Sequence, residues 1–197
     1  MTEPGTQPVV LITGAAVRIG AASARLLHDK GYNIVIHCNH SLEHAKALCS
    51  ELNDNRQESA AVLQAELADT TQVIELAKNS IQYWGRLDVL VNNASAFYPT
   101  PLENISNDQW DDLFASNAKA PLLLAHATAE ALKKQKGCII NISDTHTQQG
   151  LKNHAVYIMA KSALEGLTRT LARDLAPDIR VNAIAPGAIL WADQGND

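Results

Sequence analysis

The sequence lacks several features that membrane, secreted and nucleic-acid-binding proteins require. It has no apolar run long enough to cross a bilayer, and its first residues lack the basic-then-apolar pattern of a secretion signal. Three scattered cysteines, Cys38, Cys49 and Cys138, have neither metal-ligand spacing nor a disulfide framework. The formal net charge of −5 disfavours a nucleic-acid or anionic-membrane surface. We therefore expect a cytoplasmic protein without a metal, membrane or nucleic-acid partner.

The order of apolar segments is typical of an α/β protein. The 197 residues, 46% of them hydrophobic, suffice for a single domain over 1–197. Short β-branched runs alternate with longer amphipathic stretches, which predicts a doubly wound parallel sheet of the Rossmann type. We expect strands at Val9–Thr13, Asn33–His37, Ala60–Gln64, Asp88–Asn92, Cys138–Ser143 and Arg180–Ala185, and helices at 19–30, 42–53, 70–84, 107–134 and 155–175.

A glycine-containing turn follows the first expected strand. Gly14 and Gly20 allow close backbone approach, and the helix that begins near Ile19 presents free N–H groups to a pyrophosphate. The spacing departs from G-x-G-x-x-G, so a simple tight connection is the alternative. Arg18 lies between the glycines, where its guanidinium either clamps phosphate oxygens or is merely solvated.

The end of the second strand bears on the choice of dinucleotide. The segment 37–41 contains no Asp or Glu that would bind a ribose 2′-hydroxyl and repel a 2′-phosphate, which favours NADPH. His40 and Ser41 are candidate donors to that phosphate, although a surface histidine is an equal alternative. After the third strand, Glu66 and Leu67 are expected to flank the adenine.

Tyr157 and Lys161 lie four residues apart in the last long helix. Positions i and i+4 share a helix face, so the ammonium group can lower the pKa of the phenol toward the working range of a general acid. An isolated Tyr-x-x-x-Lys is more often an ordinary stretch of helix. The helix begins near the carboxyl end of the fifth strand, which is the sheet edge where ligands bind.

Several motifs together, in order and spacing, resemble the short-chain dehydrogenase/reductase family over essentially the whole chain. The resemblance implies that Tyr157 is the proton donor, that Lys161 holds the nicotinamide ribose, and that Asn117 kinks a helix and positions a proton-relay water. It also implies that members of the family continue for about fifty residues beyond Asp197, through a lid and a final strand, and that they often form homotetramers. The motif residues, including the expected cofactor contacts, are Thr13, Gly14, Gly20, Asn92, Asn93, Ala94, Asn117, Tyr157, Lys161, Pro186, Gly187 and Ile189.

Three departures from the usual family pattern resemble the pteridine reductase subgroup. Arg18 replaces a glycine, Ser95 replaces the glycine after Asn93-Ala94, and Asp144 stands thirteen residues before Tyr157, where serine is usual. In that subgroup the arginine and serine contact ligand or cofactor. An aromatic residue at the position of Phe97 stacks the pterin against the nicotinamide, and a core aromatic is the alternative for Phe97.

The carboxyl group of Asp144 suits a pterin, because ring nitrogens need a proton as hydride arrives at the adjacent carbon. Asp144 can bond the Tyr157 phenol and relay protons if its pKa rises in a closed pocket, or it can simply cap the following loop. The leading hypothesis is an NADPH-dependent reductase of a dihydropterin such as dihydromonapterin, dihydrobiopterin or dihydrofolate. The alternatives are a carbonyl reductase of 3-oxoacyl thioesters or small ketones, and a non-catalytic NADP-binding sensor.

Overall fold

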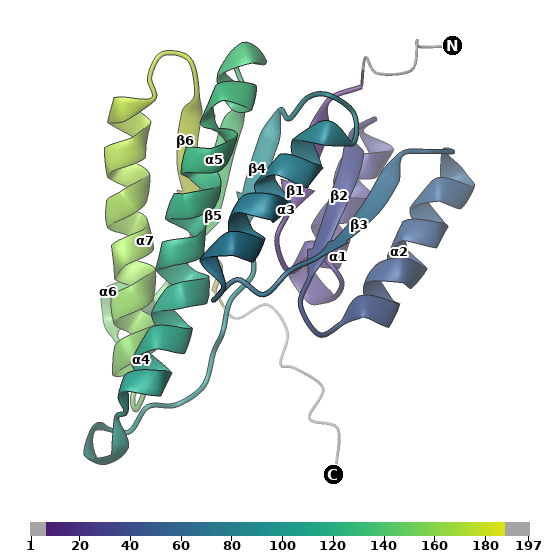
Figure 1. The fold of residues 1–197 in the computed structure, drawn as a ribbon. Helices are drawn as coiled ribbons and strands as arrows, with labels where there is room; N and C mark the ends of the chain where they lie inside the picture. Colours follow the sequence, from purple (N-terminus) through teal and green to yellow (C-terminus); the bar gives the residue numbers. More distant parts are fainter. Residues whose placement is uncertain (1–6, 188–197) are drawn as a thin grey trace.

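A computed structural model describes residues 7–187, which form a six-stranded parallel sheet with a helical layer on each face (Figure 1). The spatial order of the strands is β3-β2-β1-β4-β5-β6, so the chain starts in the middle of the sheet and winds outward in both directions. This confirms the predicted doubly wound topology. The strands are β1 Val9–Ile12, β2 Asn33–Cys38, β3 Ala60–Gln64, β4 Val89–Asn92, β5 Cys138–Ile142 and β6 Arg180–Ile184.

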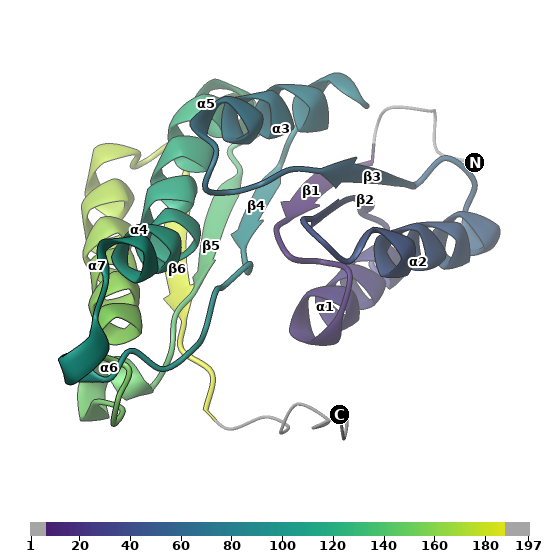
Figure 2. The ribbon, with the colours of Figure 1, turned by 60° about the horizontal axis from the view of Figure 1, so that its bottom comes forward.

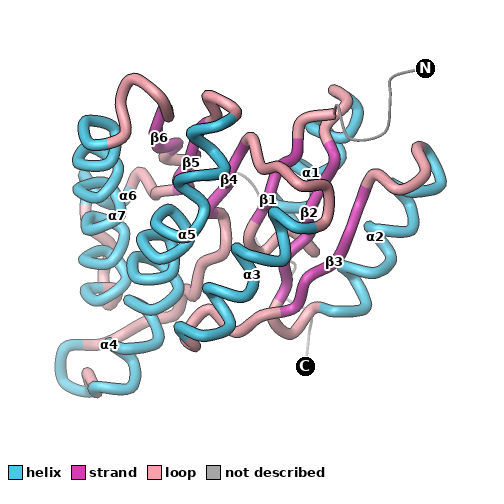
Figure 3. The backbone as a smooth tube through the Cα atoms, turned by 45° about the horizontal axis from the view of Figure 1, so that its top comes forward, coloured by secondary structure: helices cyan, strands magenta, loops and turns pink. Residues whose placement is uncertain are grey.

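The helices divide between the two faces of the sheet, with the strands in one row between them (Figure 3). Alternate residues of β1 face opposite ways: Val9 and Leu11 pack with the α3, α5 and α7 layer, whereas Val10 and Ile12 pack with α1 and α2. The longer helices are α1 Arg18–Asp29, α2 Leu42–Asn55, α3 Thr70–Gln82, α4 Asn107–Phe114, α5 Ala120–Lys134 and α7 Ala155–Asp174. None of the helices within 7–187 is long and apolar enough to span a membrane.

The helix expected over 107–134 is not continuous. A π-helical turn, η2 (Ala115–Lys119), separates α4 from α5 and places Asn117 at its centre. The 3₁₀ turn η1 (Leu102–Asn104) and the short helix α6 (His146–Gln149) were not predicted. Each is too short to produce a hydrophobic period in the sequence.

All six strands end at the same edge of the sheet, because every strand pair is parallel. Figure 2 turns this edge toward the viewer and shows α4, α6 and the beginning of α7 beside the ends of β5 and β6. The outer strand β6 is less well covered than the inner strands, because Ile184 is 54% exposed. The carboxyl edge therefore brings together the phosphate turn after β1 and the polar segments after β4 and β5.

Candidate active site

The turn after β1 is fixed by side chains that bond its backbone. The Thr13 hydroxyl accepts hydrogen bonds from the backbone N–H groups of Asn93 (2.9 Å) and Ala94 (3.0 Å). In return, Asn93 Nδ2 donates to the carbonyl oxygens of Thr13 (2.8 Å) and Gly14 (3.1 Å). The segment after β4 thus holds the turn after β1 and accounts structurally for Asn93 and Ala94.

Both predicted glycines occupy positions that a larger residue would strain. Gly14 has φ +62°, and a Cβ there would lie 2.9 Å from the Cα of Ala94. A Cβ on Gly20 would overlap the carbonyl oxygen of Gly14 and lie 2.8 Å from the Cα of Ala15. The first turn of α1 has no acidic residue and no side-chain cap, which leaves its N–H groups and dipole for an anion. These features fit a dinucleotide pyrophosphate.

Arg18 and Ile19 begin α1 at the rim of this turn. Arg18 has φ +52° and an exposed side chain, so its guanidinium is free to reach a ligand, and Ile19 is half-buried. A left-handed backbone at an arginine is uncommon, and the loop keeps it at the point where α1 meets the carboxyl edge. The position suits the predicted phosphate or substrate contact, which stays a prediction.

At the adenine end, the structure joins Glu66, which was predicted to flank the adenine, to the end of β2. Asn39 Nδ2 donates to Glu66 Oε2, and Glu66 Oε1 accepts from the backbone N–H of Ala68 at 3.1 Å. The acidic group therefore reaches the end of β2 from the segment after β3. Leu67 is buried, so its side chain offers little surface to a ligand.

His40 and Ser41 lie where β2 turns into α2. His40 is exposed and Ser41 is half-buried at the N-cap of α2, where its side chain makes no capping hydrogen bond. Both side chains are thus accessible at the ribose end of the edge. Their assignment to a 2′-phosphate stays a prediction, and the nearby Glu66 carboxylate is the feature that opposes it.

The structure brings Tyr157 and Lys161 together, as predicted from their helical spacing, and adds Asp144, as expected from the family resemblance. The Tyr157 hydroxyl donates to Asp144 Oδ2 at 2.7 Å. Lys161 is 3% exposed, and its Nζ donates to the carbonyl oxygen of Ile142 at 2.8 Å, lying 5.9 Å from the centre of the Tyr157 ring. The end of β5 therefore positions the lysine through its backbone and the tyrosine through Asp144.

The electrostatics differ from the expected tuning of Tyr157 by Lys161. Burial and then the hydrogen bond and charge of Asp144 raise the pKa of Tyr157, so the phenol keeps its proton. Burial lowers the pKa of Lys161 to about 8, and the Asp144 charge only partly offsets this. Burial also acts to raise the pKa of Asp144, but bonds from the His146 N–H, Tyr157 and the His146 ring outweigh it and leave the pKa lowered.

Asp144 also caps the loop, so the two roles considered for it coexist. Its Oδ1 accepts from the backbone N–H of His146 at 2.8 Å and contacts the His146 ring at 2.7 Å, while Oδ2 faces Tyr157. The preceding Ser143 cannot stand in for a catalytic serine, because it is buried and donates to Glu165 at 2.7 Å. Asp144 is therefore the side chain of this segment that meets Tyr157.

Asn117 and Ser95 form a second polar pair beside the phenol. In the π turn, Asn117 Nδ2 donates to the carbonyl oxygens of Ala96 and Leu113, each at 2.9 Å, and its Oδ1 accepts from the Ser95 hydroxyl at 2.8 Å. The amide thus ties the helix break to the loop after β4. Ser95 also opposes the rise in the pKa of Tyr157 through a side-chain hydrogen bond, which places it next to the phenol.

Phe97 lies beside Tyr157 with 56% of its surface exposed. Its ring meets Tyr157 edge-on at 4.8 Å and stacks on His154 at 4.7 Å with an interplanar angle of 15°. Phe97 is therefore not a core residue, and the core alternative was wrong. The sequence reasoning missed His154, because its position before α7 matches no motif used there.

The remaining predicted contacts follow β6. The carbonyl oxygen of Pro186 accepts from the Thr145 hydroxyl at 3.3 Å, so this segment lies next to the Asp144 loop. Gly187 is exposed at the end of the described residues. Ile189 lies outside them.

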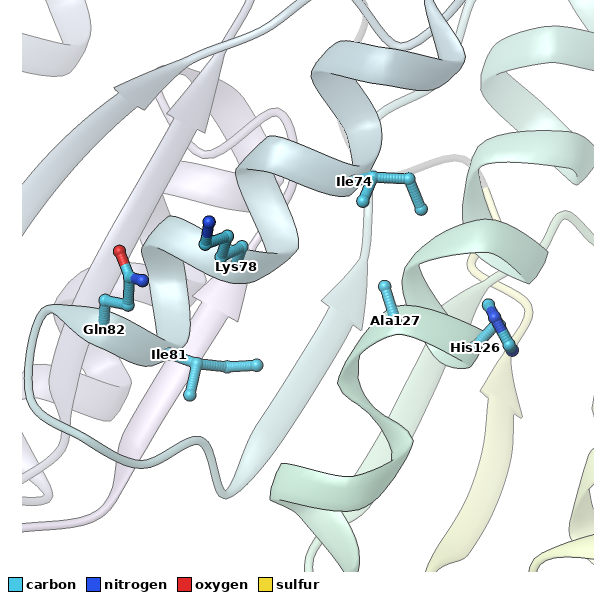
Figure 4. A pocket seen from close by; sticks show the side chains of 6 residues that line it. All are labelled: Ile74, Lys78, Ile81, Gln82, His126 and Ala127. Carbon is cyan, nitrogen blue, oxygen red and sulfur yellow. The ribbon is translucent and has the colours of Figure 1, made fainter.

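A hollow of about 400 Å³ between α3 and α5 is separate from this site (Figure 4). Its lining contains none of the residues predicted to be functional. The lining residues are Ile74, Lys78, Ile81, Gln82, His126 and Ala127. They come from α3 and α5 and not from the segments that follow the strands at the carboxyl edge, so we do not assign the reaction to this hollow.

Comparison with known proteins agrees with the geometry. The family model described as short chain dehydrogenase matches residues 8–195. The chain belongs to this family. It is therefore an oxidoreductase with a Rossmann-type fold, and its family and relatives imply a nicotinamide cofactor.

Two kinds of reductase are similar to this short chain dehydrogenase at nearly equal identity. Pteridine reductase 1 of Leishmania tarentolae is 38% identical, with 98% of this chain and 80% of the relative covered. The 3-oxoacyl-(acyl-carrier-protein) reductase FabG of Staphylococcus aureus is 36% identical, with 91% and 74% covered. A 3-oxoacyl-(acyl-carrier-protein) reductase of Synechocystis is also 36% identical, with 93% and 75% covered. Identity alone leaves the substrate open.

Proposed function

We propose that this protein is an NADPH-dependent pteridine reductase that reduces a dihydropterin, such as dihydromonapterin, dihydrobiopterin or dihydrofolate, to its tetrahydro form. The observation that carries the proposal is the hydrogen bond from Tyr157 to Asp144 Oδ2 at 2.7 Å. A carboxylate next to the phenol suits a substrate whose ring nitrogen takes up a proton. A ketone needs instead a neutral donor that stabilises a developing alkoxide.

The arrangement of the side chains supports a division of roles. NADPH would supply the hydride, held by the phosphate turn, Lys161 and the segment around Pro186. Tyr157 holds a proton at its hydroxyl, because its pKa is raised by burial and by Asp144. Asp144 is the acceptor at the other end of this bond and faces His146, so protons can pass between the phenol and the loop.

The exposed ring of Phe97 supplies the surface for a flat substrate. Because Phe97 meets Tyr157 edge-on at 4.8 Å, a planar ring stacked on it would lie near the phenol. Ser95 and Arg18 flank the same edge and present a hydroxyl and a guanidinium to polar substituents of a pterin.

The direct test is turnover. The protein is incubated with NADPH and 7,8-dihydromonapterin, dihydrobiopterin or dihydrofolate while absorbance at 340 nm is followed, and acetoacetyl thioesters serve as the competing substrate. We expect NADPH oxidation with at least one dihydropterin and little with the thioester. Turnover of the thioester alone would overturn the proposal. Parallel reactions with NADH test the preference for NADPH, which the nearby Glu66 carboxylate opposes.

A second candidate, a 3-oxoacyl or small-ketone reductase, is favoured by the 36% identity to the FabG proteins. The variant Asp144→Ser separates the two. A pterin reductase should lose about a hundredfold in kcat/KM, the low end of what proton transfer by a positioned side chain contributes. A ketone reductase should keep or gain activity. A sensor without catalysis would bind NADPH and turn over none of the substrates. The presence of Tyr157, Lys161 and Asn117 makes the sensor the weakest candidate.

The assembly state is a further part of the proposal. We expect a homotetramer on the family resemblance and a cytoplasmic location on the composition of the sequence. Light scattering after size-exclusion chromatography of the full-length protein checks the tetramer, and a monomer that is fully active would contradict it.

A further inference from the structure

A buried histidine lies directly beneath the phosphate turn, and no motif singled it out. His37, in β2, is 1% exposed. Its Nδ1 is 3.1 Å from the backbone N of Gly14, and its Nε2 is 3.1 Å from the carbonyl oxygen of Ala65. The backbone carbonyl of His37 also accepts from the N–H of Ala15 at 2.9 Å. One residue thus binds two consecutive peptides of the turn.

These partners decide where the imidazole proton lies. The Gly14 N–H is a donor, so Nδ1 must accept, and the Ala65 carbonyl is an acceptor, so Nε2 must donate. The ring is therefore neutral and carries its hydrogen on Nε2. A second proton would place a donor opposite the Gly14 N–H, remove that bond and leave a buried charge.

Within residues 7–187, His37 and Asn93 supply the hydrogen bonds that hold the Gly14 N–H and carbonyl groups. Its N–H is bound by His37 and its carbonyl oxygen by Asn93 Nδ2 at 3.1 Å, while its Cα packs against Ala94. Gly14 in turn faces Gly20 at the start of α1, where the pyrophosphate would bind. Loss of the His37 bond frees one side of the turn.

We propose that His37 is a positioning residue of the dinucleotide site, whose neutral Nε2–H tautomer holds the Gly14 peptide in the conformation that receives the pyrophosphate. This inference rests on dinucleotide binding as set out under the proposed function. It adds a consequence: dinucleotide affinity weakens in acid as His37 takes up a proton.

The surroundings of the ring favour the neutral form. Burial lowers the pKa of His37, and the Ala65 bond and the charge of Glu66 offset this only in part. Glu66, after β3, is the charged side chain that acts on the ring. The turn after β1 meets the ring through the uncharged backbone N–H of Gly14. Acid weakening should therefore begin below pH 6.5, the ordinary value for histidine, and reach at most about tenfold per pH unit.

Two conservative variants separate the bonds. His37→Asn keeps an oxygen near Nδ1 for the Gly14 N–H, whereas His37→Gln keeps an NH₂ near Nε2 for Ala65 and loses the Gly14 acceptor. We measure the Kd of NADPH and of NADH by fluorescence titration between pH 5 and 8. At pH 7.5, His37→Asn should bind within about threefold of wild type and His37→Gln about tenfold more weakly, since one buried N–H loses its partner.

The pH series tests the tautomer separately. The ratio of wild-type to His37→Asn affinity cancels the titration of the cofactor 2′-phosphate and of other side chains, and it should fall in acid. A matched control is His28, which is also buried, near the other end of α1, and contacts Ser59 Oγ at 2.7 Å. His28→Asn should leave the pH dependence of binding unchanged.

The outcomes are distinct. Equal Kd values for the two His37 variants, or a ratio that does not change with pH, would overturn the role of His37. Nitrogen-15 NMR of the wild-type imidazole is independent of any variant's folding: the Nε2–H tautomer is expected, and an Nδ1–H tautomer would also overturn it. Absence of binding of both NADPH and NADH by the wild type would instead overturn the proposed function, and the role of His37 with it.

Discussion

The two ends of the carboxyl edge are held in different ways. At the phosphate turn, the side chains of Thr13, Asn93 and His37 bond backbone groups of neighbouring strands. At the catalytic end, Tyr157 bonds the side chain of Asp144 and Ser95 bonds that of Asn117, while Lys161 and Asn117 also bond backbone carbonyl groups. The first end is close-packed around glycines, whereas the second includes Phe97, which is 56% exposed.

The difference separates what the cofactor demands from what the substrate demands. A pyrophosphate is recognised by backbone N–H groups, so its site depends on backbone shape and tolerates little added volume. A substrate ring is recognised by a few side chains. Under the proposed function, one replacement, Asp144 where serine is usual, changes the kind of substrate that is reduced. Variants at the catalytic end should therefore change rates, and variants at the phosphate turn should change stability and binding.

The largest effect is expected from Tyr157→Phe. Loss of the proton donor should lower kcat about a thousandfold, or about 4 kcal/mol in activation free energy. NADPH oxidation at 340 nm measures this, and fluorescence titration should show NADPH binding within about threefold of wild type.

Tyr98→Phe is a matched control, because the Tyr98 hydroxyl also donates to a carboxylate, Asp112, at 2.8 Å. Burial, followed by Asp112, raises the pKa of Tyr98 to about 12. This variant breaks the same kind of bond toward α4, leaves the bond from Tyr157 to Asp144 intact and should keep kcat. Equal losses in both variants would mean that Tyr157 serves structure and not catalysis.

The next largest effect, on stability and NADPH binding, is expected from Gly20→Ala at the phosphate turn. The new Cβ would overlap the Gly14 carbonyl oxygen and lie 2.8 Å from the Cα of Ala15. Overpacking against backbone should lower the free energy of unfolding by about 3 kcal/mol and weaken NADPH binding. Urea unfolding measures the first and fluorescence titration the second.

Gly166→Ala provides the comparison within α7. Its Cβ would come no closer than 3.9 Å to a neighbour, the guanidinium of Arg169. Replacing a helical glycine at an open position should raise the free energy of unfolding by about 0.5–1 kcal/mol. If Gly20→Ala proved as harmless as Gly166→Ala, this would contradict the close packing of α1 against the backbone of the turn.

The sequence predicted the elements of this edge better than the bonds within it. Hydrophobic periodicity placed all six strands, and helical i, i+4 geometry placed Tyr157 beside Lys161, because both depend on nearby residues. The break at Asn117 came only from family resemblance, since 107–134 reads as one amphipathic helix. A π turn leaves no separate period of its own.

The missed contacts join segments far apart in the chain. Glu66, after β3, bonds Asn39 at the end of the neighbouring strand β2, and His37 reaches Gly14 from 23 positions away. Neither contact follows from local spacing. A histidine inside an otherwise apolar strand was nevertheless a usable signal, because a buried polar ring must find partners. The expected lowering of the Tyr157 pKa was wrong because burial and Asp144 act on the phenol in the opposite direction.

An intermediate effect concerns the pH dependence of stability from Lys161. Its folded-state pKa of about 8 is below its ordinary value, so between these values the unfolded chain binds more protons. The folded state therefore gains stability as pH rises from about 8 to 10. Relative to Lys161→Met, the wild type should gain about 2 kcal/mol in free energy of unfolding across this interval. Urea unfolding at several pH values checks it, and a difference that falls with pH would contradict the burial of the charge.

The smallest effect is expected from Phe97→Ala, and it tests how far the catalytic end is independent of the fold. Because the ring is 56% exposed, the free energy of unfolding should change by no more than about 0.5 kcal/mol. Stacking contributes about 1 kcal/mol, so KM for the dihydropterin should rise about fivefold to tenfold while NADPH binding stays unchanged. Leu102→Ala, at a side chain that is 82% exposed, is the control and should alter neither quantity. An unchanged KM together with a loss of about 2 kcal/mol in unfolding would show that Phe97 supports the loop after β4 and does not hold a substrate.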